Sequence, residues 1–416
     1  MHNFLYRMRR RARGFQWDDG DHRWMWFLAV NSMLYISSAA YTPYLTMYYA
    51  EKGMTSFEIG ILAAIGPIIS ICVQPLWAIF SDRTGRRKLT LSIVIAGTGL
   101  AVLCYRLGDS FLFFFLISML VYSFSTSICP LSDALTLEYA NEKHINFARI
   151  RIGGTLGYAV MALVIGGFLK QDPSISFLVA AGCYGVMFLV SLKVPIAGTS
   201  VKREKRKRQK GEKREKSRIF YDNTYVFVLI ACFVMTIGLS FNTNFMSVYL
   251  GELGYDQNMV GIANAVSALS EVPILLLAGK LMQKFTPVQI LCASCFFMAL
   301  RLVLMTGETT FFIIASQLLQ SVTYMTMYYS CVMFMSQNTY PDRRSQGQSI
   351  FTMVQAGFGS ILGSLVGGSV AEMLDLQTAY RVMALFLCVI GLVVVAAYRI
   401  YTKKQRAAQT MAPPAA

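Results

Sequence analysis

Four charged residues lie inside long apolar stretches of this chain, and they are the side chains best placed for chemistry: Asp133, Arg151, Glu271 and Arg301. Placing such a charge inside a bilayer costs roughly 2.5 to 3.5 kcal/mol, so charges at this depth usually serve a purpose. A carboxylate and a guanidinium group can pair with each other, and both can bind the polar groups of a ligand. The pattern indicates ligand binding or structural ion pairs.

The depth of each charge within its apolar stretch indicates which groups can meet. Asp133 lies near the end of one stretch and Arg151 near the start of the next, so the two lie at similar depth and can pair. Glu271 precedes Lys280 by nine residues, roughly 14 Å of helix, which places its carboxyl group near the bilayer centre. A carboxyl group there can carry a proton. A purely structural pair is the alternative in both cases.

Membrane-spanning helices must position these charges. The chain is 55% hydrophobic and 14% charged, with a mean hydropathy of +0.49, which is too apolar for a soluble protein. Backbone groups in lipid must be satisfied within the segment, so the spans are helical. We predict an all-α membrane protein with twelve spans, at residues 24–49, 57–80, 89–107, 110–138, 148–169, 175–193, 222–250, 257–280, 287–306, 309–337, 347–371 and 378–400.

The net charge of +16 is distributed as in a membrane protein and does not indicate nucleic-acid binding. With the N-terminus in the cytoplasm, nearly all of the 38 Lys and Arg lie in or beside cytoplasmic segments; the exceptions are Lys52, Arg106, Lys170, Arg301 and Arg381. This asymmetry follows the positive-inside rule. We therefore expect a multi-pass protein of the cell membrane with both termini in the cytoplasm.

The spans divide into two sets of six around a basic linker. We predict a cytoplasmic N-terminal segment at 1–23, a six-helix bundle at 24–193, the linker at 194–221, a second bundle at 222–400 and a cytoplasmic tail at 401–416. The linker cannot form a core and is expected to be a solvated tether. The two halves echo each other, which is typical of one transporter architecture.

Short motifs make this resemblance specific. The stretch Gln74–Lys88, with the sequence QPLWAIFSDRTGRRK, and the stretch Ala148–Ala159 resemble the lactose permease and oligosaccharide symporter branch of the major facilitator superfamily. Leu269–Pro273 and Ala299–Arg301 are similar to the phenylpropionate and nucleoside symporter-like group. The resemblance covers residues 24–400 and implies two pseudo-symmetric six-helix bundles.

The resemblance also implies roles for individual residues. The charged loop, which matches a signature loop of the superfamily, is expected to form a gate from Asp82, Arg83, Gly85, Arg86 and Arg87. The Asp82 carboxylate can pair with basic residues and helix ends across the interface between the halves, and the basic residues of the loop also fix the topology. For the charges within the spans the resemblance implies substrate contact by Asp133 and Arg151, a ring at Tyr158 that stacks on the substrate, a proton-coupling carboxyl group at Glu271 and its partner at Arg301.

One departure from the resembling families affects the coupling mechanism. Those families carry a His in the tenth span, whereas this sequence places Gln320 there, and its three His lie in predicted cytoplasmic segments. Glutamine cannot titrate, but it can bond a hydroxyl or carbonyl group. Polar residues within spans, among them Asn242, Gln320 and Tyr324, are expected to line a water-filled cavity, although bonding between helices is an equal alternative.

We expect a secondary active transporter that works as a monomer by alternating access, with proton symport of an oligosaccharide, a nucleoside or an aromatic acid. The alternatives are a nutrient sensor that no longer transports, and an uncoupled facilitator or exporter. A membrane enzyme is disfavoured because no nucleophile with a base is apparent. Cys292 and Cys295 have CxxC spacing in an apolar helix without further ligands, so we expect no metal, cofactor or disulfide.

Overall fold

The computed structural model describes residues 22–143, 147–169, 172–195, 219–340 and 343–410, and every regular element within these ranges is a helix. The N-terminal half contains α2 (Trp24–Glu51), α3 (Ser56–Cys72), α4 (Gln74–Thr84), α5 (Arg87–Leu103), η1 (Cys104–Leu107), α6 (Phe111–Ser125), α7 (Ile128–Lys143), α8 (Phe147–Phe168) and α9 (Ile175–Ser191). The predicted linker at 194–221 lies mostly outside the described residues, so the predicted domain boundaries stay predictions.

The C-terminal half repeats this arrangement. It contains α10 (Thr224–Glu252), α11 (Gln257–Lys284), α12 (Pro287–Met305), α13 (Thr310–Leu318), η2 (Ser321–Met325), α14 (Thr326–Asn338), α15 (Arg344–Thr352), η4 (Met353–Gly359), α16 (Ser360–Met373) and α17 (Leu376–Thr410). Each of the twelve predicted spans corresponds to one of these helices or to a consecutive run of them. The prediction of two six-helix bundles is confirmed.

Several spans contain breaks that have local causes. The second span divides into α3 and α4, and α4 begins with Pro75 in its first turn, where the missing N–H costs nothing. Two spans of the C-terminal half contain π-helical turns, η2 and η4. Such turns widen the helix and are frequent at functional sites.

The helices differ in how well they suit lipid. Seven helical runs in the described residues are long and apolar enough on their own to cross a membrane, and α8 and α9 contain shorter apolar helices. The long helix α2 is not among them, because hydroxyl and amide side chains interrupt its apolar residues, and the side chains of α11 lie partly outside the described structure. Both α2 and α11 pack against α8.

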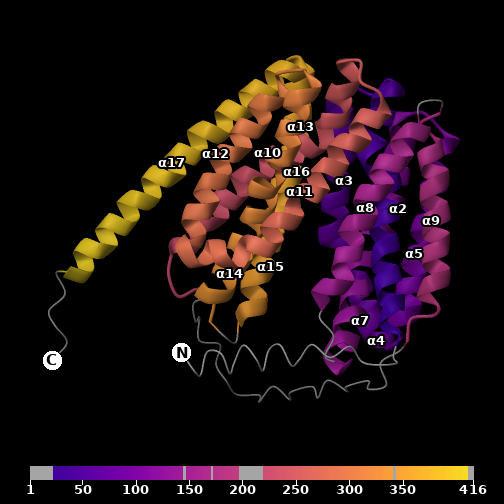
Figure 1. The fold of residues 1–416 in the computed structure, drawn as a ribbon, viewed down its shortest axis with the longest axis horizontal. Coiled ribbons are helices and arrows are strands. Elements are labelled where there is room, and N and C mark those ends of the chain that lie inside the picture. Colours follow the sequence, from indigo (N-terminus) through magenta and orange to yellow (C-terminus); the bar gives the residue numbers. More distant parts are fainter. Residues whose placement is uncertain (1–21, 144–146, 170–171, 196–218, 341–342, 411–416) are drawn as a thin grey trace.

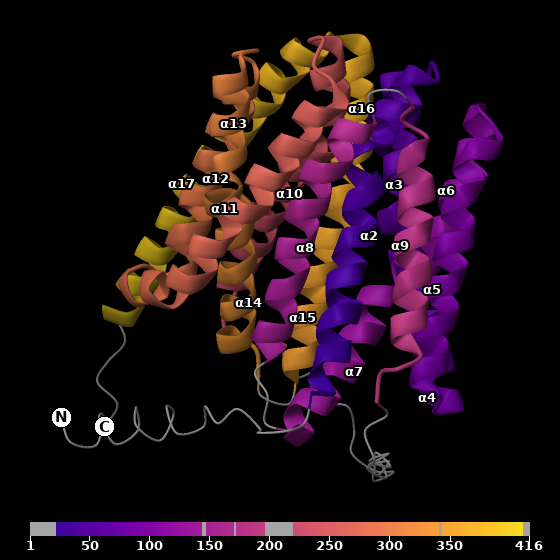
Figure 2. The ribbon, with the colours of Figure 1, turned by 45° about the vertical axis from the view of Figure 1, so that its right-hand side comes forward.

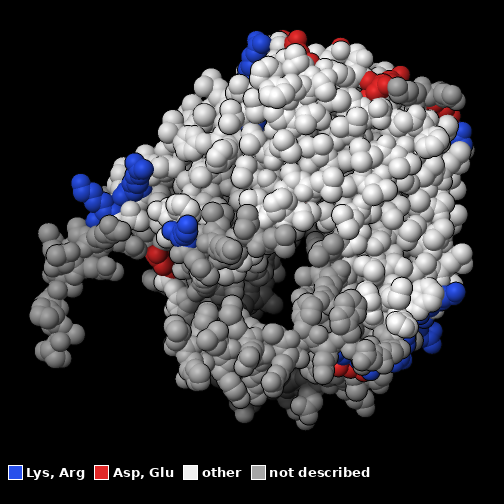
Figure 3. All heavy atoms as spheres, viewed as in Figure 1, with Lys and Arg blue, Asp and Glu red and all other residues white. Residues whose placement is uncertain are grey.

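The two halves meet at one end and separate at the other (Figure 1). Figure 2 shows α8 beside α2, and α16 beside α3. At the closed end, Thr46 Oγ1 and Ser247 Oγ lie 2.8 Å apart across the halves, and Gln257 Nε2 donates to Glu51 Oε1 at 2.9 Å. Toward the opposite end a hollow opens between the halves (Figure 3).

Close packing at the closed end depends on glycine. A Cβ atom on Gly60 of α3 would lie 2.6 Å from the carbonyl oxygen of Ser364 and 3.0 Å from Cα of Gly368, both in α16. No other residue fits at this crossing without moving one helix. The backbones of the two halves therefore touch directly.

Candidate functional site

A cavity of ≈ 550 Å³ lies between the two halves and is the candidate solute site. Its volume is in the range of small-molecule sites. The described residues that line this cavity include no charged side chain, and their polar members come from both halves: Ser70, Tyr122, Thr126, Thr236, Ser240, Thr243, Asn244, Gln320, Tyr324, Gln355, Ser360 and Ser364. Such a lining suits a neutral polar solute better than an ion.

A second cavity, of ≈ 350 Å³, is strongly charged and lies within the N-terminal half. It is lined by Glu51, Lys52, Arg106 and Asp172 among others, near the loops of the closed end. Lys52 Nζ pairs with Asp109 at 2.7 Å beside it. Because the described residues that line this cavity all belong to the N-terminal half, we do not expect relative movement of the halves to open or close it directly.

A hydroxyl and amide cluster forms one wall of the central cavity. Asn244 Nδ2 donates to Ser364 Oγ at 2.8 Å and to Ser240 Oγ at 3.3 Å. Ser240 Oγ in turn donates to the carbonyl oxygen of Ser360 at 3.0 Å. These bonds connect α10 to α16 and hold the amide in a fixed orientation at the cavity surface.

Two charged residues of the C-terminal half, Arg301 and Glu271, belong to a row of hydrogen-bonded side chains that reaches this cavity. Arg301 is 2% exposed and donates to Gln317 Oε1 at 2.7 Å and to Gln320 Oε1. Gln320 Nε2 donates to Glu271 Oε1 at 3.1 Å. The side chain of Gln320 therefore bonds both Arg301 and Glu271. The role of Arg301 as the partner of Glu271 in proton coupling stays a prediction.

Of three predicted substrate contacts, Asn242, Gln320 and Tyr324, two line the central cavity and one does not. Gln320 and Tyr324 line the cavity. Asn242 is 2% exposed and accepts a hydrogen bond from Tyr380 of α17 at 3.5 Å, and it is not part of the lining, so the structure does not bring it to the cavity. Its neighbours Thr243 and Asn244 on α10 line the cavity instead.

The predicted sugar-contact group in the N-terminal half is only partly described. Tyr158 lies where α8 packs against α11, and its hydroxyl group is 3.5 Å from Asn264 Oδ1. Asp133 lies in α7, with Cys129 Sγ 3.7 Å from its Oδ2. Residue 151 belongs to α8, but the Arg151 side chain lies outside the described part of the structure. The pairing of Asp133 with Arg151 stays a prediction.

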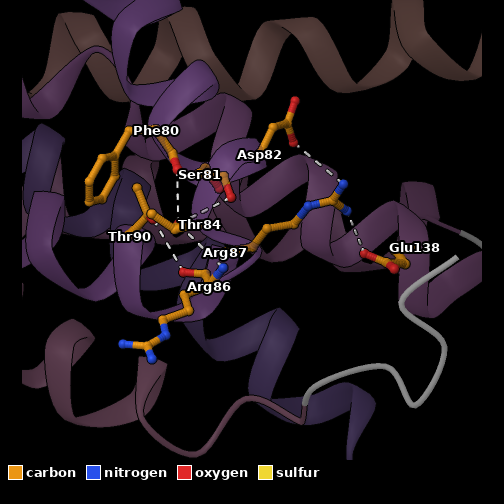
Figure 4. A network of polar contacts seen from close by, with 8 residues as sticks. All are labelled: Phe80, Ser81, Asp82, Thr84, Arg86, Arg87, Thr90 and Glu138. Atoms are coloured by element: carbon orange, nitrogen blue, oxygen red, sulfur yellow. Dashed lines mark hydrogen bonds and ion pairs between the residues drawn. The ribbon is translucent and has the colours of Figure 1, made fainter. Parts of the chain in front are cut away.

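The gate loop is ordered within the N-terminal half (Figure 4). The guanidinium group of Arg87 contacts Asp82 at 3.5 Å and Glu138 of α7 at 2.8 Å. Gly85 ends α4 with φ of 65°, a left-handed conformation that favours glycine. Arg83 and Arg86 are exposed. The expected contact of Asp82 across the halves is not among the described contacts of this conformation, in which the halves are apart at this end.

Sequence reasoning missed two residues of these networks. Glu138, which binds Arg87, was assigned to the end of a span and not to the gate. Gln317, which binds Arg301, lies three residues before Gln320, so the two face the same side of a helix. The spacing of Gln317 and Gln320 on one face of an apolar helix could have indicated that both bind a buried Arg.

Two bundles of six helices around a cavity between them define a membrane transporter of the major facilitator fold. The chain belongs to the MFS_1 like family, whose model matches residues 25–382. The relatives are transporters, and so this chain is a transporter and not an enzyme.

Individual relatives are distant but extend over most of the chain. The uncharacterized transporter YwbF of Bacillus subtilis (strain 168) is 24% identical over 348 residues, 83% of this chain and 86% of the relative. The maltose permease of Geobacillus stearothermophilus is 23% identical over 380 residues, 90% of this chain and 94% of that one. The crystal structure of the nucleoside transporter NupG superposes with a TM-score of 0.79 at 16% identity, covering 91% of this chain and 99% of NupG.

Proposed function

We propose that this protein moves a neutral polar solute, a saccharide or a nucleoside, across the cell membrane by alternating access, together with a proton carried by Glu271. The observation that carries the proposal is the set of amide and hydroxyl groups, with no charged group among the described residues, that lines the central cavity. Amides and hydroxyl groups can bond sugar hydroxyls or a base, and the two lining tyrosines, Tyr122 and Tyr324, offer ring faces for stacking. The names of the relatives, a maltose permease and a nucleoside transporter, support the same two classes.

An aromatic acid fits this cavity less well. A carboxylate taken from water needs a cation or several donors aimed at it. Arg301 bonds the lining residue Gln320, but Arg301 is 2% exposed and already donates to both Gln317 and Gln320. An anionic substrate would have to break those bonds to reach it.

The asymmetry of the two ends supports the proposal of alternating access. We assign the open end to the cytoplasm, because it carries Arg83, Arg86 and Arg87 of the basic loop. Closing that end requires the halves to approach there, and opening the other requires separation of pairs such as Thr46 with Ser247. In the present conformation Arg87 holds Asp82 and Glu138 within one half. We propose that Asp82 pairs across the halves only when this end closes.

Uptake into proteoliposomes tests the proposal. Labelled maltose, uridine and phenylpropionate are compared, with and without an imposed pH gradient. We expect maltose or uridine to enter, faster with the gradient, and phenylpropionate not to compete. Transport of phenylpropionate alone would contradict the neutral substrate. Binding of maltose or uridine without any flux would instead indicate a sensor. Equal rates of uptake with and without the pH gradient would indicate an uncoupled facilitator.

A further inference from the structure

Gln320 belongs both to the lining of the central cavity and to the hydrogen-bond network of Arg301 and Glu271. Its side chain lines the central cavity, and the same amide bonds both Arg301 and Glu271. It lies at the residue before the π-helical turn η2, whose backbone is wider than that of an α-helix. We infer that Gln320 is the residue through which solute binding and protonation of Glu271 affect each other. This inference rests on the proposed function.

The bonding partners fix the orientation of the Gln320 amide. An Arg side chain carries only donors, so the amide oxygen must face Arg301. The amide nitrogen must then face Glu271, and Oε1 of Glu271 must accept its hydrogen. A flipped amide would set N–H against N–H at Arg301. The hydrogen bonds therefore all point in one direction: Arg301 donates to Gln320, and Gln320 donates to Glu271.

This direction of the hydrogen bonds favours the ionised form of Glu271 in the present conformation. A hydrogen bond donated to a carboxylate stabilises the charged form. The amide nitrogen of Gln320 carries two hydrogens, so a solute hydroxyl or carbonyl group that accepts one of them affects Glu271 when the new bond shifts the amide away from the carboxylate. When the solute draws the amide toward the cavity, Glu271 loses a donor and its protonated form gains. Solute and proton then bind together, which is the sign that symport needs.

Charged and titratable groups close to Glu271 provide the comparison for Gln320. Among the described residues, Arg301 on α12 and Tyr158 on α8 interact electrostatically with Glu271. Neither lines the cavity. Gln317 provides a matched comparison, because it lies on the same span and bonds the same Arg301, yet it is 1% exposed and does not line the cavity.

Proton uptake on solute binding tests the inference. Purified protein in weakly buffered detergent solution is mixed with saturating maltose or uridine, and a pH indicator dye reports the protons taken up. Gln320→Met keeps the length of the side chain but removes both hydrogen bonds, and Gln317→Met is its control. We expect the parent and Gln317→Met to take up protons equally, and Gln320→Met to bind solute with uptake reduced at least about 5-fold.

A second measurement separates coupling from loss of structure. Solute affinity is measured by calorimetry at several pH values; we expect it to rise as the pH falls in the parent and to be nearly flat in Gln320→Met. If Gln320→Met does not bind solute, Gln320→Asn is used, whose shorter side chain cannot reach both Arg301 and Glu271. Parental proton uptake or parental pH dependence in the binding-competent variant overturns the role of Gln320. Uptake that persists in Glu271→Gln overturns the proposed function instead, and a parent without uptake overturns both.

Discussion

Replacing Gly60 by Val should shift this protein away from the conformation described here. The new Cβ atom would lie 2.6 Å from the carbonyl oxygen of Ser364. An ordinary contact is close to 3.4 Å or more, so α3 and α16 must separate by a large part of an ångström. Overpacking of this kind costs about 1 to 3 kcal/mol. Because the cost falls only on the state in which this end is closed, the equilibrium should move about 5- to 150-fold toward the state in which it is open.

Thiol labelling at the closed end measures this shift. Ser247 is 1% exposed and bonds Thr46 across the halves. In a background without the native cysteines, Ser247→Cys should react with a maleimide faster when Gly60 is Val. Gly182→Val in α9 is the matched control, because nothing lies within 4 Å of its Cβ position. Equal labelling in Gly60→Val and Gly182→Val would refute the argument that this crossing holds the end closed.

Three further changes probe the gate, the cavity wall and the buried arginine. Asp82→Asn should impair uptake while leaving membrane abundance near normal, since Asp82 is exposed in this conformation; a parental uptake rate would contradict a gating role. Ser364→Val removes the acceptor of the Asn244 amide and should weaken solute affinity about 3- to 10-fold, as calorimetry can show. Arg301→Met leaves the buried oxygen of Gln317 without its donor and should lower the free energy of unfolding by about 2 to 5 kcal/mol; an unchanged thermal midpoint in detergent would count against it.

The positions of the spans could be predicted from the sequence because apolar length and basic loops are local signals. Breaks within the spans were harder. Pro75 explains where α4 begins, but nothing in Ser321–Met325 announces a π-helical turn, since that geometry depends on how α14 packs against its neighbours. The local pattern specifies a helix, and the tertiary packing decides its winding.

The candidate site was predictable as a set of polar residues but not as a pattern of contacts. Depth placed Glu271 in the interior and the resemblance placed Gln320 there, and both belong to the network that was found. The same reasoning could not decide between Asn242 and Asn244, two residues apart on α10, because only the rotation of that helix decides which of them faces the cavity. It also could not anticipate that an amide would lie between Arg301 and Glu271.

Accumulation of solute by Glu271→Gln in proteoliposomes tests the central claim most directly. The substitution keeps the size of the side chain and fixes it in a neutral form, so steps that need deprotonation stop while exchange of bound solute can continue. With an imposed pH gradient, the parent should accumulate labelled maltose or uridine above the external concentration. Glu271→Gln should fail to accumulate either solute but should still show counterflow. Gradient-driven accumulation by Glu271→Gln at the parental level would contradict the account.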